Sequence, residues 1–327
     1  MKGYKGFDKN FKCKGMQYEV GKEFSVDGEL EMCKNGLHFC EYPLDVFAYY
    51  EPSISKYAEV EALGEINNEN PHFDIEMDSK ICTNKLKVCT EIGIPDLVHA
   101  AEEYIKDNID TNKAQKIMSE TKNIDEFSIA ASTGEFSISA ITTKSFPYPS
   151  IAANTGNRSL ATNINSYSAA TNTGKFSVAT NIGFRSIASN TGDGSASTNT
   201  GDQSAAIGTG CDSVAINTGE RSIATTTGKR GLAINEGCQS LATNTSNGGA
   251  AVVTGENSIA VAFGCEGVAK GSLGSWIVLS EWICGRKVGK DGGCVVKDVK
   301  CFKVDGKDIL PDTFYKLVDG KPIAREG

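Results

Sequence analysis

Eleven cysteines and three histidines are the side chains of this 327-residue chain that could act as nucleophiles or metal ligands. No Cys-x-x-Cys pair occurs, and no histidine lies at zinc-ligand spacing from a cysteine. We therefore expect free thiols from a reducing compartment and no metal site, with disulfide pairing as the alternative. The cysteines are Cys13, Cys33, Cys40, Cys82, Cys89, Cys211, Cys238, Cys265, Cys284, Cys294 and Cys301.

Other catalytic signatures are missing from the sequence. No glycine-rich phosphate loop opens a helix, no Gly-x-Ser-x-Gly elbow occurs, and neither His72 nor His99 has a nucleophile motif beside it. The residues by themselves therefore predict a protein without enzymatic activity and without a cofactor.

The charge distribution narrows the range of partners. The formal net charge is −8, and residues 1–125 contain 24 of the 41 acidic side chains but only 15 of the 33 basic ones. Because no basic stripe is present, little counterion release is available, and we expect no binding to nucleic acid. The sequence has no signal-peptide pattern and no run of about 18 apolar residues, so we expect no membrane association.

Most of the elements that must position any functional side chain belong to a nonapeptide repeat. Between residues 150 and 267, units such as Ser213-Val214-Ala215-Ile216-Asn217-Thr218-Gly219 recur every nine residues. So short a unit is one strand and one turn, which cannot bury its apolar face until neighbours stack on it. The predicted fold class is therefore mainly β, with a nonapeptide-repeat β-solenoid over residues 126–271.

Two features of the coil stay open in the sequence. Position two of each unit is always apolar, so we place positions two and four inside; the alternative buries the Ser, Ala and Asn of positions one, three and five in a thin core. Small residues favour a flattened coil of about 18 residues, whereas the 27-residue spacing of Cys211, Cys238 and Cys265 favours a three-sided one. We expect 18 residues per coil, with Asn-Thr-Gly forming a turn in which Gly supplies positive φ.

The Ser-Val-Ala-Ile-Asn-Thr-Gly unit at residues 213–219 resembles the head repeats of YadA-like trimeric adhesins, which carry a similar Ser-Val-Ala-Ile-Gly core. The resemblance implies a similar local packing of the repeats. Those repeats have a longer period, and this chain shows no coiled-coil stalk or membrane anchor, so trimerisation and surface display are not carried over.

Residues 1–125 are predicted to form a small α/β or α+β domain. In its last strand, Ala58, Val60 and Ala62 alternate with Glu59 and Glu61, which indicates one buried and one exposed face. The expected elements are strands at residues 18–20, 30–32, 36–40 and 57–66, a helix from Pro43, and a helix within residues 95–122 that could cap the first coil.

The run at residues 35–50, Asn-Gly-Leu-His-Phe-Cys-Glu-Tyr-Pro-Leu-Asp-Val-Phe-Ala-Tyr-Tyr, together with Tyr4-Lys5-Gly6-Phe7, resembles the start of an uncharacterised domain family frequent in phages and gut bacteria. Members commonly continue into repeats of this kind and a short C-terminal segment. The resemblance implies a phage-encoded or phage-derived protein and carries no assigned activity.

Residues 1–66 are also similar to the ADP-ribosyltransferase fold, in which a Gly-aromatic-Phe strand, a Tyr-bearing helix and an apolar strand cradle nicotinamide. That similarity implies NAD, with His38 as its ligand, Tyr49 stacking on nicotinamide and Glu61 binding a ribose hydroxyl. No arginine precedes Arg158 and no histidine precedes His38, so the early NAD ligand of that fold is absent from its usual place. The other interpretation gives His38 a backbone hydrogen bond, packs Tyr49 on a helix and leaves Glu61 on a solvated strand face.

Residues 272–327 break the period and are predicted to form a β-rich C-terminal cap, with hairpin turns at Asp305-Gly306 and Asp319-Gly320. We place Trp276 and Trp282 in the core of this cap or at its junction with the last coil. As the alternative, the two rings form a sugar-stacking or partner-binding site.

These expectations combine into a non-enzymatic, phage-encoded β-solenoid protein that presents its end domains or a coil face to a partner. That partner is a protein or a surface glycan, and we expect homo-oligomers. The alternative is an ADP-ribosyltransferase-like effector that uses NAD and has a solenoid scaffold. The expected location is the cytoplasm, or the virion for a phage structural protein.

Overall fold

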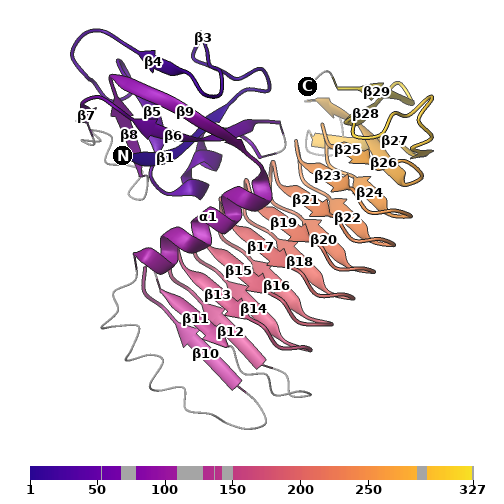
Figure 1. Cartoon of the computed structure of the whole chain (residues 1–327). Helices are drawn as coiled ribbons and strands as arrows, with labels where there is room; N and C mark the ends of the chain where they lie inside the picture. Colours follow the sequence, from indigo (N-terminus) through magenta and orange to yellow (C-terminus); the bar gives the residue numbers. More distant parts are fainter. Residues whose placement is uncertain are drawn as a thin grey trace. The chain divides into compact units, whose positions relative to one another are not determined.

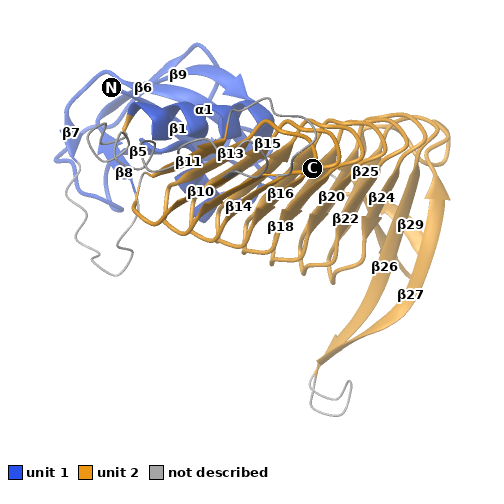
Figure 2. Ribbon diagram, turned by 90° about the horizontal axis from the view of Figure 1, so that it is seen from below, with its two compact units in different colours: residues 1–107 blue, residues 108–327 orange. Residues whose placement is uncertain are grey.

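The computed structural model describes residues 1–52, 54–67, 79–108, 128–135, 137–141, 150–285 and 293–325 (Figure 1). The chain divides into two compact units, Met1–Asp107 and Asn108–Gly327 (Figure 2).

The first unit is built on a seven-stranded sheet with the order β4-β9-β6-β1-β5-β8-β7. All of its strand pairings are antiparallel, so it is an α+β rather than a parallel α/β arrangement. Its elements are β1 Lys2–Phe7, β2 Lys12–Cys13, β3 Met16–Gln17, β4 Glu23–Ser25, β5 Leu37–Cys40, the 3-10 helix η1 Pro43–Ala48, β6 Lys56–Ala62, β7 Ile66–Asn67, β8 Lys80–Thr83, β9 Lys85–Ile92 and α1 Ile94–Asp107.

Local patterns predicted part of this unit. The strands expected at residues 36–40 and 57–66 are β5 and β6, and on β6 the side chains of Ala58, Val60 and Ala62 are buried. Pro43 opens a helix, although it is a 3-10 helix. The predicted helix within 95–122 is α1 as far as Asp107, and residues 109–122 lie outside the described residues. Neither helix in the described part of the chain is long and apolar enough to cross a membrane.

The strands expected at residues 18–20 and 30–32 are wrong, because Tyr18 and Met32 are buried from loops. The Tyr18 ring packs on the rings of Phe7 and Phe24, with centroid distances of 5.1 and 4.6 Å, although Tyr18 lies outside any strand. Residues 30–32 lead into a turn that Glu31 and Asn35 close with one isolated bridge. Burial at these sites therefore needs no ladder of backbone hydrogen bonds.

The second unit is a β-solenoid whose successive strands alternate between two ten-stranded sheets. The first solenoid sheet comprises β10 Ser128–Ser132, β12 Ser150–Asn154, β14 Ala169–Asn172, β16 Ile187–Asn190, β18 Ala205–Gly208, β20 Ile223–Thr226, β22 Leu241–Asn244, β24 Ile259–Ala262, β26 Trp276–Gly285 and β27 Gly293–Lys303. The second comprises β11 Ile138–Ile141, β13 Leu160–Asn163, β15 Val178–Asn181, β17 Ala196–Asn199, β19 Val214–Asn217, β21 Leu232–Asn235, β23 Ala250–Val253, β25 Val268–Gly271, β28 Tyr315–Val318 and β29 Lys321–Ala324.

The coils from β12 to β25 contain 18 residues, as expected. Parallel neighbours pair residues 18 apart, as in Ala169 with Ile187. The 27-residue alternative is wrong, because an odd number of nonapeptides puts Cys238 on the opposite edge of the coil from Cys211 and Cys265. A flattened coil keeps only side chains separated by even numbers of units in one column.

The assignment of positions two and four to the interior is wrong for the first sheet, where the alternative holds. Along β16, Ala188 and Asn190 at positions three and five are fully buried, whereas Ile187 at position two is 45% exposed. The facing sheets meet through the methyl groups of alanines, which form the core together with the small polar residues. The invariably apolar position two is therefore exposed or half-exposed along β12 to β24 of the first sheet. Along β13 to β25 of the second sheet it is buried, as are positions three and five.

Hydrogen bonds satisfy most of the polar groups of this thin core, with buried Ser213 Oγ as an exception among the described residues. Asn190 Nδ2 donates to the Ser177 carbonyl at 2.9 Å, and Asn190 Oδ1 accepts from the Gly192 N–H at 3.0 Å. The Ser186 N–H donates to Ser204 Oγ of the next coil at 3.0 Å. Repeated along the coil, these bonds make buried Asn and Ser favourable, since a buried polar group is costly only when it lacks a partner.

The glycine at position seven serves close packing rather than a left-handed turn. A Cβ atom on Gly174 would lie 1.8 Å from the Gly156 carbonyl oxygen of the preceding coil. The left-handed residue is the ninth of each unit, such as Phe176 at φ 52° and Arg185 at φ 54°. The expected positive φ at Asn-Thr-Gly is therefore wrong, because stacking of the turns, and not their curvature, demands glycine there.

The C-terminal strands extend and close both solenoid sheets. Strand β26 pairs in parallel with β24 and forms a hairpin with β27 that extends away from the coils (Figure 2), while β28 and β29 continue the second sheet. Ile277, Leu279, Tyr315 and Leu317 join the buried alanine core with larger side chains. Such side chains cover the open end of a coil, which would otherwise expose its core.

Two details of this segment differ from the sequence analysis. Asp319-Gly320 is the predicted hairpin turn between β28 and β29, but Asp305-Gly306 lies between β27 and β28, which do not pair with each other. Cys284 and Cys294 form a disulfide across the β26–β27 hairpin, so the expectation of free thiols is wrong for this pair. The other nine cysteines form no disulfide.

Candidate ligand-binding site

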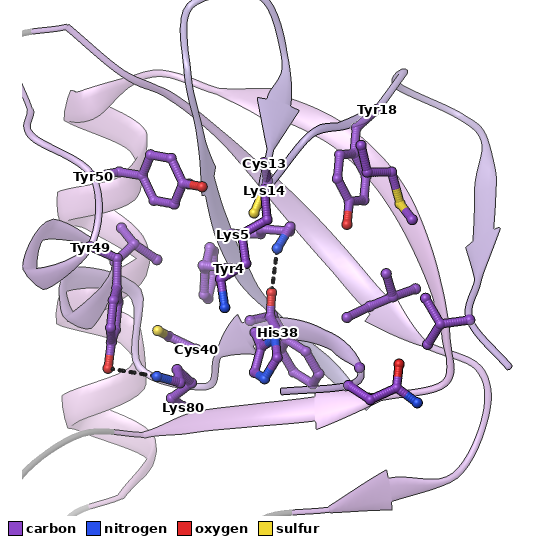
Figure 3. Close-up of a pocket in the computed structure, with 18 of the residues that line it drawn as sticks. Tyr4, Lys5, Cys13, Lys14, Tyr18, His38, Cys40, Tyr49, Tyr50 and Lys80 are labelled. Carbon is purple, nitrogen blue, oxygen red and sulfur yellow. Dashed lines mark hydrogen bonds between the residues drawn. The ribbon is translucent and has the colours of Figure 1, made fainter. Parts of the chain in front are cut away.

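A cavity of about 540 Å³ opens in the first unit, between β1, β5 and the segment that follows η1 (Figure 3). Its described lining includes five aromatic rings and four lysines but no Asp or Glu. The cavity is therefore a cationic and aromatic site within an acidic domain. The aromatic and basic lining residues are Tyr4, Lys5, Lys14, Tyr18, Lys34, His38, Phe39, Tyr49, Tyr50 and Lys80.

Lys5 is the buried cation of the cavity. It shares the inner face of β1 with Phe7 because alternate residues of a strand point to the same side. Its side chain is almost covered, at 4% exposure, and its Nζ donates to the His38 carbonyl at 2.6 Å. Nζ also lies 5.7 and 5.3 Å from the ring centroids of Phe7 and Tyr18. Burial lowers the pKa of Lys5, so an anion entering the cavity would relieve the cost of its charge.

His38 is held in its neutral form. Burial, reinforced by the charges of Lys14, Lys5 and Lys80, lowers the pKa of His38 to about 4. Its Nε2 accepts a hydrogen bond from the Cys33 N–H at 2.9 Å. The imidazole is therefore uncharged at neutral pH and occupied by the backbone, as the non-catalytic interpretation of His38 expects.

Tyr49, Tyr50 and Lys80 form one side of the cavity (Figure 3). Lys80 Nζ lies 4.4 Å from the Tyr49 ring centroid and donates to Tyr49 Oη at 3.3 Å. Tyr50 packs on β1 at Gly6, where a Cβ atom would lie 2.5 Å from the tyrosine ring. With Tyr49 at 41% exposure, its ring is available for stacking on a ligand.

The structure brings together two of the three residues of the ADP-ribosyltransferase set. His38 and Tyr49 line the cavity, whereas Glu61 does not. Glu61 lies on β6, where its neighbours across the sheet are Lys2 on β1 and Lys87 on β9. The half-exposed position of Glu61 agrees with its interpretation as part of a solvated strand face.

Sequence reasoning missed Lys5, Tyr18, Tyr50 and Lys80 as site residues. They come from β1, a loop, the segment that follows η1, and β8, and only the tertiary fold brings these segments together. One signal was available for Lys5. Lys5 lies two residues before Phe7, which places it on the buried face of the strand. A buried lysine is rare unless it has a polar or charged partner.

The two tryptophans lie at the junction with the last coil. Trp276 extends the column of Ile259 and is 41% exposed. Trp282 is half-buried; its Nε1 donates to the Phe263 carbonyl at 2.9 Å, and its ring meets the Phe263 ring edge-on. Sequence analysis placed both tryptophans in the core of the cap or at this junction, and the structure has them at the junction. A binding role for them stays a prediction.

Residues 1–100 match a protein-family model described as "Domain of unknown function (DUF7666)". The matched residues contain the complete seven-stranded sheet and all the lining residues of the cavity. Comparisons with curated proteins and with solved structures found no match. An uncharacterised domain followed by a β-solenoid is thus confirmed, while phage origin and the resemblances to adhesins and ADP-ribosyltransferases stay predictions.

Proposed function

We propose that this protein is a non-enzymatic β-solenoid scaffold whose N-terminal domain binds an anionic small molecule with a planar ring system, such as a nucleotide. One observation carries the proposal: the cavity combines four lysines and five aromatic rings with no carboxylate among its described lining residues. At about 540 Å³ its volume lies within the range of small-molecule sites.

The two kinds of side chain would recognise two parts of the ligand. Ammonium groups such as those of Lys5 and Lys80 suit phosphate or carboxylate oxygens, and no carboxylate among the described lining residues competes with the ligand for them. The exposed Tyr49 ring offers a stacking surface for a base or a similar ring. Neutral His38 adds no further positive charge at pH 7.

The proposal excludes NAD cleavage for a chemical reason. Cleaving the glycosidic bond of NAD develops positive charge on the ribose, which needs a nearby carboxylate. The cavity lining provides none, and Glu61 lies elsewhere on the sheet. We therefore propose binding without turnover, and the transferase hypothesis predicts NAD consumption that a Glu61→Gln variant abolishes.

Isothermal titration of the full chain with ATP, ADP and NAD tests both hypotheses. We expect saturable binding of at least one nucleotide that weakens by about 10-fold or more in Lys80→Met and Tyr49→Ala, because each variant removes one recognition group. Lys106→Met is the matched control, since Lys106 lies on α1, is ion-paired with Glu103 and does not line the cavity.

Absence of binding by all three nucleotides, or equal weakening in the Lys106 control, would refute the proposed site. Consumption of NAD that depends on Glu61 would refute the non-enzymatic part. Circular dichroism of each variant separates loss of a ligand contact from loss of the fold.

We also propose that the solenoid forms homo-oligomers through its first sheet. The outward position-two residues of that sheet make one column, in which Ile151, Ala169, Ile187, Ala205 and Ile223 are successive partners. The isoleucines are 44–45% exposed and separated by small alanines. At about 4.8 Å between strands, their ridges recur every ~9.6 Å, so a second copy can insert its isoleucines above the alanines.

A further inference from the structure

Three cysteines converge where the C-terminal hairpin meets the last coil. Cys284 and Cys294 are directly opposite each other on β26 and β27, and Cys265 lies in the turn between β24 and β25. The Sγ atoms of Cys265 and Cys284 are 3.5 Å apart, and all three sulfurs lie within 4.8 Å of one another. The strand pairing causes this convergence, because β26 is the neighbour of β24 in the first solenoid sheet.

The disulfide accounts for the proximity of only two of these three cysteines. Cys284 and Cys294 are bonded, which leaves Cys265 free against the bond. Elsewhere in the solenoid, Cys211 occupies the same turn position as Cys265, and Cys301 lies on β27, but neither belongs to a described cluster of possible metal ligands. The packing of three sulfurs is thus particular to this junction and not a general property of the repeat.

We propose that, after reduction of the disulfide, Cys265, Cys284 and Cys294 form a three-thiolate site for a soft metal ion, Cu(I) or Zn(II). Thiolates on one zinc ion at about 2.3 Å lie about 3.8 Å apart in tetrahedral geometry. The 3.5 Å between the Cys265 and Cys284 sulfurs and the upper limit of 4.8 Å for the cluster bracket that value. After reduction Cys284 and Cys294 are no longer bonded to each other. The three sulfurs can then lie at the corners of one triangular face of the metal's coordination sphere.

The ligand set selects the class of metal. The cluster among the described residues contains only sulfur, which suits Cu(I) and Zn(II) and does not suit Mg²⁺ or Ca²⁺. A trigonal Cu(I) ion would be complete with three thiolates, and a tetrahedral Zn(II) ion would take a water molecule as its fourth ligand. The exposed positions of Cys284 and Cys294 give both water and metal access.

The chemistry balances with one reductant, a small dithiol. The dithiol gives two electrons and two protons, the Cys284–Cys294 bond breaks into two thiols, and the dithiol closes into its own disulfide. Metal binding then displaces three protons, one from each thiol. In the oxidised protein the disulfide joins the two strands of the hairpin. In the metal-bound protein the metal joins both strands to Cys265 in the turn of the last coil.

Metal titration of the full chain, reduced by an immobilised dithiol that is removed without air, tests the site. We expect one equivalent of Cu(I) or Zn(II) to bind, measured by competition with a chromophoric chelator. In the same protein, Co(II) should give the thiolate charge-transfer absorption, and the bound metal should protect three cysteines from alkylation. Cys265→Ser should weaken binding by more than about 100-fold, since a direct ligand is worth more than the 10–100-fold of an outer contact.

The matched controls are Cys211→Ser and Cys301→Ser, which remove exposed thiols outside the cluster and should bind like the unaltered chain. The oxidised chain should bind neither metal at this site. Unchanged affinity in Cys265→Ser, or no binding by the reduced chain, overturns the proposal. Circular dichroism of the metal-free variants identifies misfolding, and a Cys284→Ser variant then provides an independent measurement of the same loss.

Discussion

Asn190→Ala would show whether the asparagine columns hold the solenoid core together. Among the bonds of the described residues, the Gly192 N–H is accepted only by Asn190 Oδ1, while the Ser177 carbonyl also accepts the Ala196 N–H at 2.9 Å. The substitution therefore orphans one buried donor, at about 1–3 kcal/mol, and removes a second bond and some packing, at about 1 kcal/mol. We expect a loss of about 3 kcal/mol, which in a unit as long as Asn108–Gly327 lowers Tm by about 6–12 °C.

Thermal and urea unfolding followed by circular dichroism measure this loss. Ile187→Asn in the Ile223→Lys background, which the oligomer proposal makes monomeric, is the matched control. Ile187 lies on the same strand as Asn190 but is 45% exposed, so its change should stay within about 0.5 kcal/mol. A large loss in Ile187→Asn together with a negligible one in Asn190→Ala would reverse the inner and outer faces and refute the described core.

Three further outcomes follow from the same structure. Gly174→Ala should destabilise the solenoid by at least about 2 kcal/mol in urea because its Cβ would lie 1.8 Å from the Gly156 carbonyl, whereas at Gly93 the nearest atom is 3.5 Å away and Ala should be tolerated. For His38, an NMR titration should give a pKa of about 4; because this is below the unfolded value of about 6.5, its stabilising contribution is complete above pH 6.5 and is lost as pH falls towards 4, and a measured pKa above 6 would contradict the buried, cationic setting. Ile223→Lys should convert oligomers to monomers in size-exclusion chromatography with light scattering, and a wild-type chain that is already monomeric at high concentration would end the oligomer proposal.

Local sequence patterns predicted the features that depend on the spacing of residues along the chain. The nine-residue period requires identical units to stack, and the alternation on β6 places Ala58 and Val60 in a core, whatever the rest of the chain does. The apolar position two of the repeat predicted the wrong buried face for the first sheet, because apolar residues also occur on the outer face of a strand. The better signal was position three, where only Ala and Ser197 occur; a core only wide enough for methyl groups accepts nothing larger.

The candidate site was predicted only in part. His38 and Tyr49 belong to one continuous run of sequence, so they could be proposed together, and they do share the cavity. Glu61 was added from a resemblance and lies outside it. Lys5 and Lys80 are far apart in the chain, and nothing in their local sequence shows that β1 and β8 flank β5.

The amino-acid sequence by itself determined the repeating strand-and-turn unit and the β-rich end, because these follow from periodicity and residue size along the chain. Only the tertiary structure decided which face of the strands is buried, since a shift of one residue exchanges the two faces without changing the period. It alone also brought the lysines around an acid-free cavity and placed Cys265 against Cys284 and Cys294, because such contacts depend on which strands become neighbours.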